Sequence, residues 1–416
     1  TDGRGGAVAF EVSDEPKDMD RSRLHIQNCT FQGNQAEDEG GALYSLRIKS
    51  VTIASCRFED NESEENDGGG AYVQRPQEDA DDVLAVASRL DVRDTIFRAN
   101  EAKESGGGLY ALQVSNVDIN NCVFKDNKAD EKGGGFYVLP YHQHTFSDVR
   151  VRNTVVESNE AKGNGGGAFV GSAATTTFTN VVVEENLSTE GLGGGACVTH
   201  SQNDADCRLD VLDSTFRANN AADNDGGGLY VLQMSNVDID NCLFESNAAG
   251  TKGGGLYAQS HANQASSDLQ VLNTVFRSNA AATNGGGAFV GTTVTTTFAD
   301  VDFLENSAGG NGGAVNMGEH ASGDEFARSR PYAVRKGYLL LQRTEEMMRA
   351  SEAGAALRRR GLGDGLKMEA LTADEVLAIS GRSPIASTLV PDPATRRCSC
   401  AGSSYHVDSC SFSQWP

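Results

Sequence analysis

The stretch Phe97–Val138, FRANEAKESGGGLYALQVSNVDINNCVFKDNKADEKGGGFYV, contains two copies of one short unit. Each copy starts with Phe-x-x-Asn, and a run of glycines begins six residues after the asparagine. A close copy of the whole stretch recurs at Phe216–Ala258. Self-similarity at a fixed period indicates a repeat architecture, so the repeat decides the fold.

The asparagine of this unit recurs ten times along the first three quarters of the chain. Its spacings are 27, 39, 27, 32, 27, 33, 28, 32 and 27 residues, so a short unit alternates with a longer one. A larger period of about 120 residues lies above this alternation, which indicates that blocks of four units were duplicated. The repeat asparagines are Asn34, Asn61, Asn100, Asn127, Asn159, Asn186, Asn219, Asn247, Asn279 and Asn306.

The residues before each asparagine alternate in character. Counting back from Asn100, the apolar Leu90 and Val92 lie ten and eight residues before it, the small Thr95 five before it and Phe97 three before it. Steps of two are typical of β-strands. Each unit is therefore predicted to form two or three short strands, which are too small to bury their own apolar face. Stacked units would share one continuous core.

The sequence thus predicts an all-β fold, a right-handed parallel β-helix of about ten coils over residues 1–320. Adjacent coils would lie about 4.8 Å apart, and parallel crossovers are nearly always right-handed. An antiparallel sandwich would instead need hairpin turns every 8–12 residues or so. The asparagines are interpreted as structural, because a side-chain amide at a bend of every coil can hydrogen-bond to its neighbours.

The matching words FRAN, FKDN, FESN, FRSN and FQGN, together with GGAL, GGGLY, GGGAF and GGAV, resemble the repeats of the polymorphic membrane proteins of chlamydiae and of related surface adhesins. The resemblance covers residues 1–317. It implies a right-handed parallel β-helix that is exposed at a cell surface and used in adhesion. The triple glycine departs from the usual pattern.

Residues 321–416 differ from the repeats. Residues 1–320 carry 22 basic and 47 acidic side chains, whereas residues 321–416 carry 13 basic and 11 acidic ones. Apolar runs at Leu339–Leu341 and Met347–Met348 have helical character, and Thr372–Glu375 has the pattern of a capping box. This segment is predicted to be a mainly helical cap or a tail, and it ends in a cluster of three cysteines.

An aromatic residue recurs shortly after the glycines and is predicted to form a column along the stack. The sequence leaves two interpretations open, an exposed strip that binds sugars or a partner, and an interior aromatic stack. The column consists of Tyr44, Tyr72, Tyr110, Tyr137, Phe169, Tyr230, Tyr257 and Phe289, with an interruption at Cys197.

Other side chains give weaker signals. Four histidines at equivalent positions of alternate coils are interpreted either as solvated loop residues or as a pH-responsive face. Cys197 and Cys207 are candidates for a disulfide. Acidic bends at Glu62–Asp67, Glu101–Glu104 and Asp223–Asp225 could attract Ca²⁺, although solvated loops are favoured and no cofactor is expected. The four histidines are His142, His200, His261 and His320.

The predicted function is non-enzymatic. The net charge of −23 excludes a bare nucleic-acid backbone as partner, and the chain has no apolar run long enough to span a membrane. We expect an extracellular or cell-surface protein that acts as an adhesin, a spacer or an envelope component, with a protein or glycan as partner. A polysaccharide-binding or polysaccharide-degrading β-helix is the alternative, but no catalytic residues can be assigned.

Overall fold

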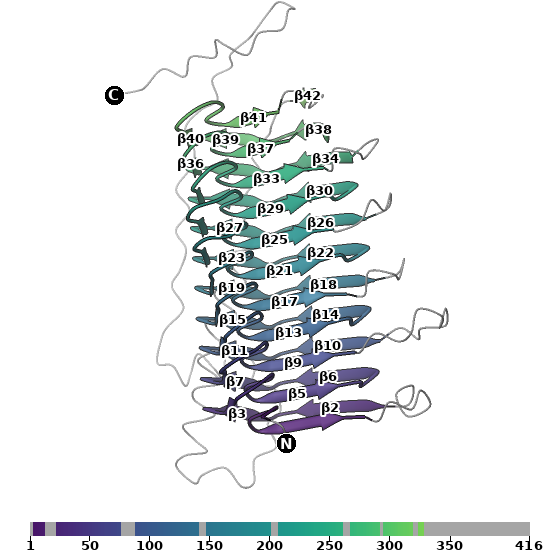
Figure 1. Cartoon of the computed structure of the whole chain (residues 1–416). Coiled ribbons are helices and arrows are strands. Elements are labelled where there is room, and N and C mark those ends of the chain that lie inside the picture. Colours follow the sequence, from purple (N-terminus) through teal and green to yellow (C-terminus); the bar gives the residue numbers. More distant parts are fainter. Residues whose placement is uncertain are drawn as a thin grey trace, which may run out of the picture. The chain divides into compact units, whose positions relative to one another are not determined.

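The computed structural model describes residues 3–12, 22–75, 88–140, 147–200, 207–260, 267–291, 294–318 and 323–327. The strands within these ranges form a stack of four parallel sheets, here named A to D (Figure 1). Among these residues no helix has the length and the apolar character needed to cross a bilayer.

Sheets A and B contain 11 strands each. Sheet A consists of β1 (Val8–Glu11), β5 (Leu43–Leu46), β9 (Ala71–Gln74), β13 (Leu109–Leu112), β17 (Phe136–Leu139), β21 (Ala168–Gly171), β25 (Ala196–Thr199), β29 (Leu229–Leu232), β33 (Leu256–Gln259), β37 (Ala288–Val290) and β41 (Val315–Met317). Sheet B consists of β2 (Arg23–Gln27), β6 (Ser50–Ala54), β10 (Arg89–Arg93), β14 (Asn116–Asn120), β18 (Asp148–Arg152), β22 (Thr175–Thr179), β26 (Arg208–Leu212), β30 (Asn236–Asp240), β34 (Ser267–Leu272), β38 (Val294–Ala299) and β42 (Gly323–Ala327).

Sheets C and D contain 10 strands each. Sheet C consists of β3 (Thr30–Gln32), β7 (Arg57–Glu59), β11 (Ile96–Arg98), β15 (Val123–Lys125), β19 (Val155–Glu157), β23 (Val182–Glu184), β27 (Thr215–Arg217), β31 (Leu243–Glu245), β35 (Val275–Arg277) and β39 (Asp302–Leu304). Sheet D consists of β4 (Gln35–Ala36), β8 (Glu62–Ser63), β12 (Glu101–Ala102), β16 (Lys128–Ala129), β20 (Glu160–Ala161), β24 (Leu187–Ser188), β28 (Asn220–Ala221), β32 (Ala248–Ala249), β36 (Ala280–Ala281) and β40 (Ser307–Ala308).

The predicted fold class, a parallel β-helix of about ten coils, is confirmed. Each coil passes once through sheets A, B, C and D, and each strand pairs in parallel with the equivalent strand of the next coil. The prediction of two or three strands per coil was too low. The fourth strand, in sheet D, is only two residues long, which is too short to show a period of two.

Bends between the sheets occur at fixed distances from the repeat asparagine. In the coil of Asn100, the backbone turns at Asp94 and Ala99, whose φ angles are 53° and 52°. The bend before sheet A uses Gly106, with φ of 72°. A β-carbon at Gly108 would lie 2.5 Å from the carbonyl oxygen of Gly135 in the next coil, so only glycine permits this approach.

One continuous apolar core fills the stack. Phe97, Phe124, Phe216 and Phe244 are fully buried. Their rings stack between adjacent coils, with centroids 4.8 Å apart for Phe97 and Phe124 and 4.9 Å apart for Phe216 and Phe244. The apolar residues of sheets A and B complete the same cluster. Single coils could not form this core, so the stack is held by contacts between neighbours.

The repeat asparagines form a hydrogen-bonded ladder inside the bend between sheets C and D. The side-chain amide of Asn127 donates to Oδ1 of Asn159 over 2.9 Å and to the carbonyl oxygen of Phe97 over 3.0 Å. The backbone N–H of Asn127 donates to the same Oδ1 of Asn159 over 3.0 Å. Each asparagine thus satisfies buried backbone groups of two neighbouring coils.

The stack extends past the predicted boundary at residue 320. Strand β42 pairs in parallel with β38, and it ends at Ala327. The rest of the predicted helical cap or tail, up to residue 416, lies outside the described residues, as does the predicted capping box.

Candidate functional site

The outer face of sheet B carries polar side chains in register along the stack. In the first three coils, Arg23 pairs with Ser50 and Ser50 with Arg89, while the next outward column holds His25, Thr52 and Asp91. The intervening Leu24 and Val51 point into the core. Because the side chains of a strand alternate, two arginines of different coils therefore lie on one face, two strand spacings apart.

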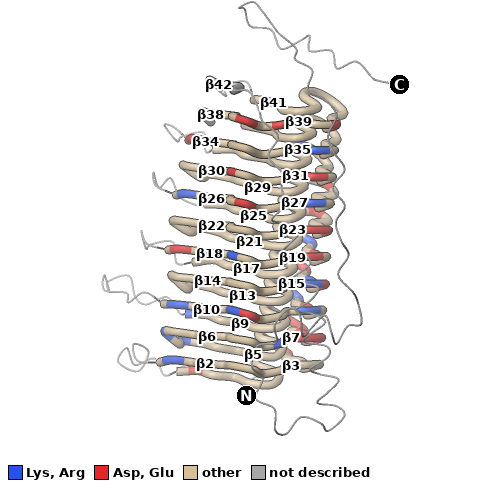
Figure 2. The backbone as a smooth tube through the Cα atoms, turned by 180° about the vertical axis from the view of Figure 1, so that it is seen from behind, with Lys and Arg blue, Asp and Glu red and all other residues tan. Residues whose placement is uncertain are grey.

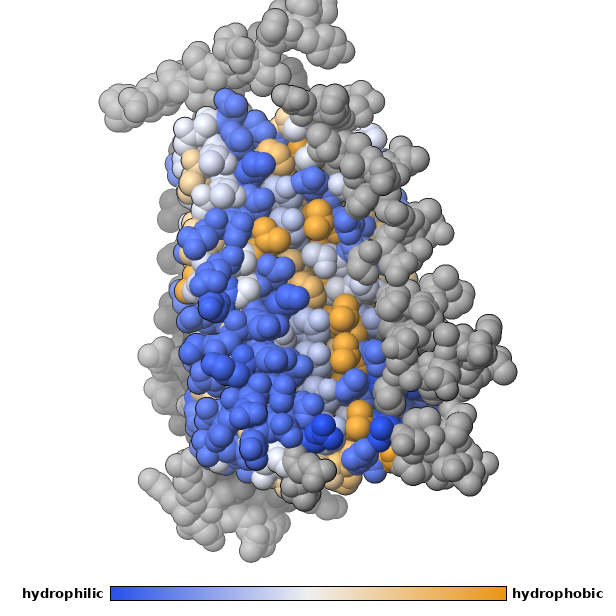
Figure 3. Space-filling model, viewed as in Figure 1, coloured by the Kyte–Doolittle hydropathy of each residue, from blue (hydrophilic) through white to orange (hydrophobic). Residues whose placement is uncertain are grey.

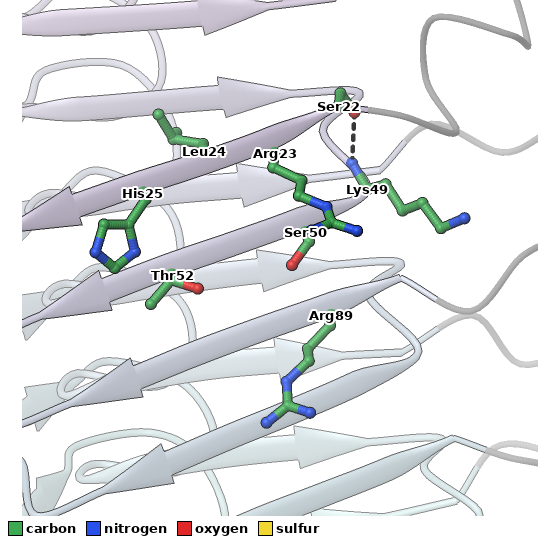
Figure 4. A pocket seen from close by; sticks show the side chains of 8 residues that line it. All are labelled: Ser22, Arg23, Leu24, His25, Lys49, Ser50, Thr52 and Arg89. Atoms are coloured by element: carbon green, nitrogen blue, oxygen red, sulfur yellow. Dashed lines mark hydrogen bonds between the residues drawn. The ribbon is translucent and has the colours of Figure 1, made fainter.

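An open pocket of about 420 Å³ lies on this face at the N-terminal coils. Figure 4 shows Arg23, Ser50 and Arg89 following one another across β2, β6 and β10, with His25 and Thr52 beside them. Arg23, His25 and Arg89 are exposed. Ser22 accepts a hydrogen bond at Oγ from the backbone N–H of Lys49 over 2.9 Å and so fixes the start of the neighbouring strand.

The charge of the pocket is opposite to that of the chain. Its lining includes Arg23, Lys49 and Arg89 but no aspartate or glutamate, whereas the net charge of the chain is −23. The nearest carboxylate on the face is that of Asp91, which forms an ion pair of 3.7 Å with Arg89. Figure 2 shows basic residues at the loop-side ends of β2, β6 and β10. Guanidinium groups and hydroxyls in this arrangement suit an anionic, hydroxyl-rich ligand.

Several carboxylates on the rest of this face pair with arginines. Arg152 forms a bidentate pair with Asp118, with distances of 2.9 and 2.8 Å from Nη2 to the two carboxylate oxygens. Arg208 binds Asp210 over 2.6 Å and Asp238 over 2.5 Å. Burial is the main cause that raises the pKa of Asp238, and Arg208 opposes it. In these pairs the negative charges of Asp118, Asp210 and Asp238 are balanced by guanidinium groups.

The aromatic column points away from the core, yet it is not an exposed strip. Leu43 belongs to the core, whereas its neighbour Tyr44 belongs to a second cluster on the other face of sheet A. All eight column side chains are 3–8% exposed. Ring faces cover one another, with centroids 5.0 Å apart for Tyr72 and Tyr110 and 4.8 Å for Tyr110 and Tyr137. Both interpretations from the sequence were therefore incomplete, because the column is an outer stack whose ring faces are closed to ligands.

Side chains at both edges explain why this outer stack is buried. Leu112, Leu139, Leu192 and Leu232 pack against it, and Figure 3 shows apolar side chains gathering in a column on the face over sheet A. Cations lie over the terminal rings of each run, with Lys132 Nζ 5.5 Å from the centroid of Phe169 and Lys252 Nζ 4.8 Å from that of Phe289. The stack thus stabilises the rod rather than presenting a sugar platform.

The carboxyl group of Asp67 contacts this stack of aromatic rings. Asp67 accepts hydrogen bonds from the backbone N–H of Ser105 over 2.8 Å and from the hydroxyl of Tyr110. Burial raises the pKa of Asp67 to about 7, and the charge of Glu104 adds to the rise. Burial also raises the pKa of the Tyr137 hydroxyl to about 12.

The expected disulfide between Cys197 and Cys207 is not formed. Both thiols are free, as are the other four cysteines of the described residues. Cys197 lies in the outer aromatic stack, whereas Cys207 lies in the core, where its Sγ is 3.4 Å from Oγ of Ser235. The two side chains are on opposite faces of the sheet wall, so proximity in sequence was misleading.

The histidine and calcium expectations are only partly covered by the structure. His200 is 5% exposed, so its interpretation as a solvated loop residue was wrong. His142, His261 and His320 lie outside the described residues. In the described parts of the acidic bends, no group of three or more His, Cys, Asp or Glu side chains is placed to hold a metal ion.

The basic pocket was not predicted from the sequence. Arg23, Ser50 and Arg89 hold the same register position in three coils, but the residue type at this position differs from coil to coil, so no repeated letter marks the pocket. The signal available was the local excess of arginine and lysine at Arg23, Lys49 and Arg89 within an acidic chain.

Comparisons with known protein families support the β-helix fold. Residues 18–212 match the family model described as right-handed β-helix region, which confirms the predicted hand. Residues 241–259 match the repeat of Chlamydia polymorphic membrane proteins, so the predicted resemblance is confirmed. The chain is thus similar to right-handed β-helix proteins and, over a short stretch, to this repeat. Comparisons with curated proteins and with solved structures give no match.

Proposed function

We propose that this chain is a non-enzymatic rod of a cell surface or of the extracellular space, and that it acts as an adhesin. Its contact surface is the outer face of sheet B, and its partner is a glycan that carries carboxylate or sulfate groups. The similarity to a polymorphic membrane protein repeat supports a surface role. The basic pocket on the acidic chain is the observation that carries the proposal.

The shape of the surface favours an extended polymer. Outward side chains of sheet B repeat at the strand spacing of about 4.8 Å, and the pocket is an opening on this face rather than an enclosed cavity that would surround a small molecule. The planar guanidinium groups of Arg23 and Arg89 can bind anionic oxygens in a bidentate manner. Ser50 and Thr52 supply hydroxyls between them.

Hydrolysis of the polysaccharide is the second candidate function. The observation that favours it is the cross-strand pair of Asp210 and Asp238, which occupy register positions opposite each other in β26 and β30. A glycosidase needs two carboxyl groups in separate protonation roles. Arg208 binds both carboxylates, so binding without cleavage is the function that the geometry supports better.

A glycan array probed with the full chain tests the proposal. The array contains uronate-bearing, sulfated and neutral glycans, and the charge-removing double variant Arg23→Gln/Arg89→Gln is measured beside the wild type. We expect binding to acidic glycans that weakens with salt, because screening shortens the reach of surface charges. The double variant should lose roughly tenfold or more in affinity.

Arg150→Gln is the matched control. Arg150 lies on the same face, outside the pocket, and pairs with Asp148 over 2.5 Å, so its loss should leave glycan binding unchanged. Equal binding of neutral and acidic glycans, or an equal loss in Arg150→Gln, would contradict the pocket. Antibody labelling of intact cells tests the surface location separately, and release of shortened glycan would support the hydrolytic alternative.

A further inference from the structure

Two cysteines lie opposite each other in the bends that join sheet B to sheet C in adjacent coils. Cys29 lies between β2 and β3, and Cys56 lies between β6 and β7. The strands on either side of the two bends pair with no change of register. Both bends turn in the same way, with φ of 54° at Asn28 and 53° at Ser55. The α-carbons of Cys29 and Cys56 are therefore one coil spacing apart, about 4.8 Å.

The two thiols also contact each other. The sulfur of Cys56 accepts a hydrogen bond from the backbone N–H of Cys29 and lies beside the Cys29 thiol. Each thiol donates to the carbonyl oxygen two residues before it, Cys29 to Gln27 over 3.2 Å and Cys56 to Ala54 over 3.1 Å. Thiols are weak donors, so these hydrogen bonds are easily given up. Disulfides join residues whose α-carbons are about 4.4–6.8 Å apart, and this pair has that spacing.

Among the described residues, no other cysteine has a cysteine opposite it in a neighbouring coil. Cys122 and Cys242 hold the same position in their own bends. Their neighbours in the next coil are Thr154 and Thr274, whose hydroxyls accept from the cysteine backbone N–H over 3.3 and 3.2 Å. Cys122 and Cys242 are thus thiols in the same setting without a partner thiol, and they serve below as internal controls.

The two thiols of the pair differ in their access to solvent. Cys29 is partly exposed, whereas Cys56 is 4% exposed. Burial raises the pKa of the Cys56 thiol, which keeps it protonated and unreactive toward reagents in solution. A reagent therefore meets Cys29 first, and Cys56 reacts with what Cys29 carries.

We propose that Cys29 and Cys56 are a thiol pair that a small-molecule disulfide oxidises to a cross-link between the two coils. The Cys29 thiolate attacks one sulfur of the small disulfide, whose S–S bond breaks and whose first half leaves. The Cys56 sulfur then attacks Sγ of Cys29, and the second half leaves as the new S–S bond forms. Each leaving thiolate takes up the proton that a protein thiol has lost. Two protein thiols are thus oxidised, and one small disulfide is reduced to two thiols.

The cross-link joins the two strands that carry the first half of the basic pocket. Arg23 lies on β2 and Ser50 on β6, and both line the pocket (Figure 4). In the described part of the chain, β2 and β3 are the end strands of sheets B and C. The β-carbons of a disulfide lie about 3.5–4.5 Å apart, so closure draws the two bends slightly together, and strands at the end of a sheet can follow. Oxidation then holds β2 against β6.

Peptide mapping of the full chain by mass spectrometry tests the proposal. The folded protein is incubated with oxidised glutathione, denatured, alkylated at its remaining thiols and digested with trypsin, which cuts between the two cysteines after Arg47 and Lys49. We expect two peptides linked through Cys29 and Cys56, whereas Cys122 is recovered in the alkylated form. Hydrogen exchange of the β2 amides should slow roughly tenfold or more in the oxidised protein, because the cross-link opposes local opening.

Cys56→Ser is the matched control, because Ser214 already holds this position in another coil and the variant should therefore fold. In this variant Cys29 should stop at the mixed disulfide with glutathione, and the treatment should leave the exchange of β2 unchanged. Absence of the linked peptides in the wild type overturns the proposal, as does a link from Cys29 to a different cysteine. Oxidation of Cys122 or Cys242 at the same rate would equally overturn it, since unfolding would then expose the thiols. Linked peptides without slower exchange in β2 would show that the bond does not hold the strand.

Discussion

At the scale of single residues, the asparagine ladder satisfies buried polar groups that nothing else in the bend reaches. Oδ1 of Asn159 accepts from both the backbone N–H and the side chain of Asn127, and Nδ2 of Asn159 donates to the carbonyl oxygen of Phe124 over 2.9 Å and to Oδ1 of Asn186 over 2.9 Å. Removing a side chain with four such hydrogen bonds from a buried bend lowers the stability of the fold. Each buried donor or acceptor left without a partner destabilises it by about 1–3 kcal/mol.

The first prediction follows from the four hydrogen bonds of the Asn159 side chain. Asn159→Ala should lower the free energy of unfolding by about 3 kcal/mol or more, measured by chemical denaturation. Asn116→Ala is the control, since Asn116 is half-buried and makes a single long hydrogen bond of 3.5 Å to Ser88. A loss of similar size in both variants would mean that the ladder contributes no special stability.

The second prediction concerns Asp67, whose pKa is raised by burial from 3.8 to about 7. The folded state therefore favours the neutral carboxyl, so the rod loses stability as the pH rises from about 4 to about 7 and regains it on acidification. Asp67→Asn keeps an oxygen acceptor for Ser105 and Tyr110 but carries no charge. Its stability should match the wild type near pH 4 and exceed it at pH 8 by on the order of 2–4 kcal/mol. Thermal unfolding at both pH values measures the difference, and a constant gap across pH would contradict it.

At the scale of elements, the stacked rings of sheet C are among the largest fully buried side chains of the coils. Phe124 is fully buried between Phe97 and the tilted ring of Phe136, with centroids 4.8 and 5.0 Å away. Phe124→Ala should cost about 3–5 kcal/mol of unfolding free energy. Phe10→Ala in β1 removes a ring that is 40% exposed and should cost far less. Denaturant titrations compare them, and a cost under about 1 kcal/mol at Phe124 would place its ring outside the core.

The outer stack of sheet A gives a second prediction at this scale. Burial raises the pKa of all six tyrosines in it, including Tyr137 and Tyr257 to about 12. An alkaline absorbance titration should therefore show that five of these hydroxyls, those of Tyr72, Tyr110, Tyr137, Tyr230 and Tyr257, stay protonated at pH 11 while the rod is folded. The denatured chain should titrate as a whole near pH 10. Ionisation of these five tyrosines near pH 10 in the folded rod would mean an open, accessible column.

How far the sequence predicts these elements depends on whether a residue acts within its own coil or between coils. Leu90, Val92 and Phe97 could be assigned to the core because alternation along one strand is a local signal. The burial of Tyr110 could not, since it depends on Tyr72 and Tyr137 in other coils and on Leu112 at the edge. The basic pocket, likewise, combines Arg23 and Arg89, which hold the same register position in two different coils, so it depends on how the coils stack.

At the scale of the whole molecule, each coil contacts only the coils before and after it. Stability is then close to a sum of coil and interface contributions, and the end coils have one neighbour instead of two. Hydrogen exchange should be slowest in β17–β28 and fastest in β1–β4 and β37–β40. Peptide-level mass spectrometry measures this gradient. Uniform protection along the rod would indicate a single cooperative unit instead.

The residue-for-residue register between coils also bears on how such a rod changes over generations. Residues 97–138 and 216–258 are near copies, and their strands occupy the same sheets with the same bends. Gain or loss of a whole four-coil block therefore brings together two surfaces that already fit, and no new interface has to arise. Recombination between the copies would change the length of the rod in steps of about 19 Å. The length of the rod can thus evolve separately from the contact surface that we propose at the N-terminal coils.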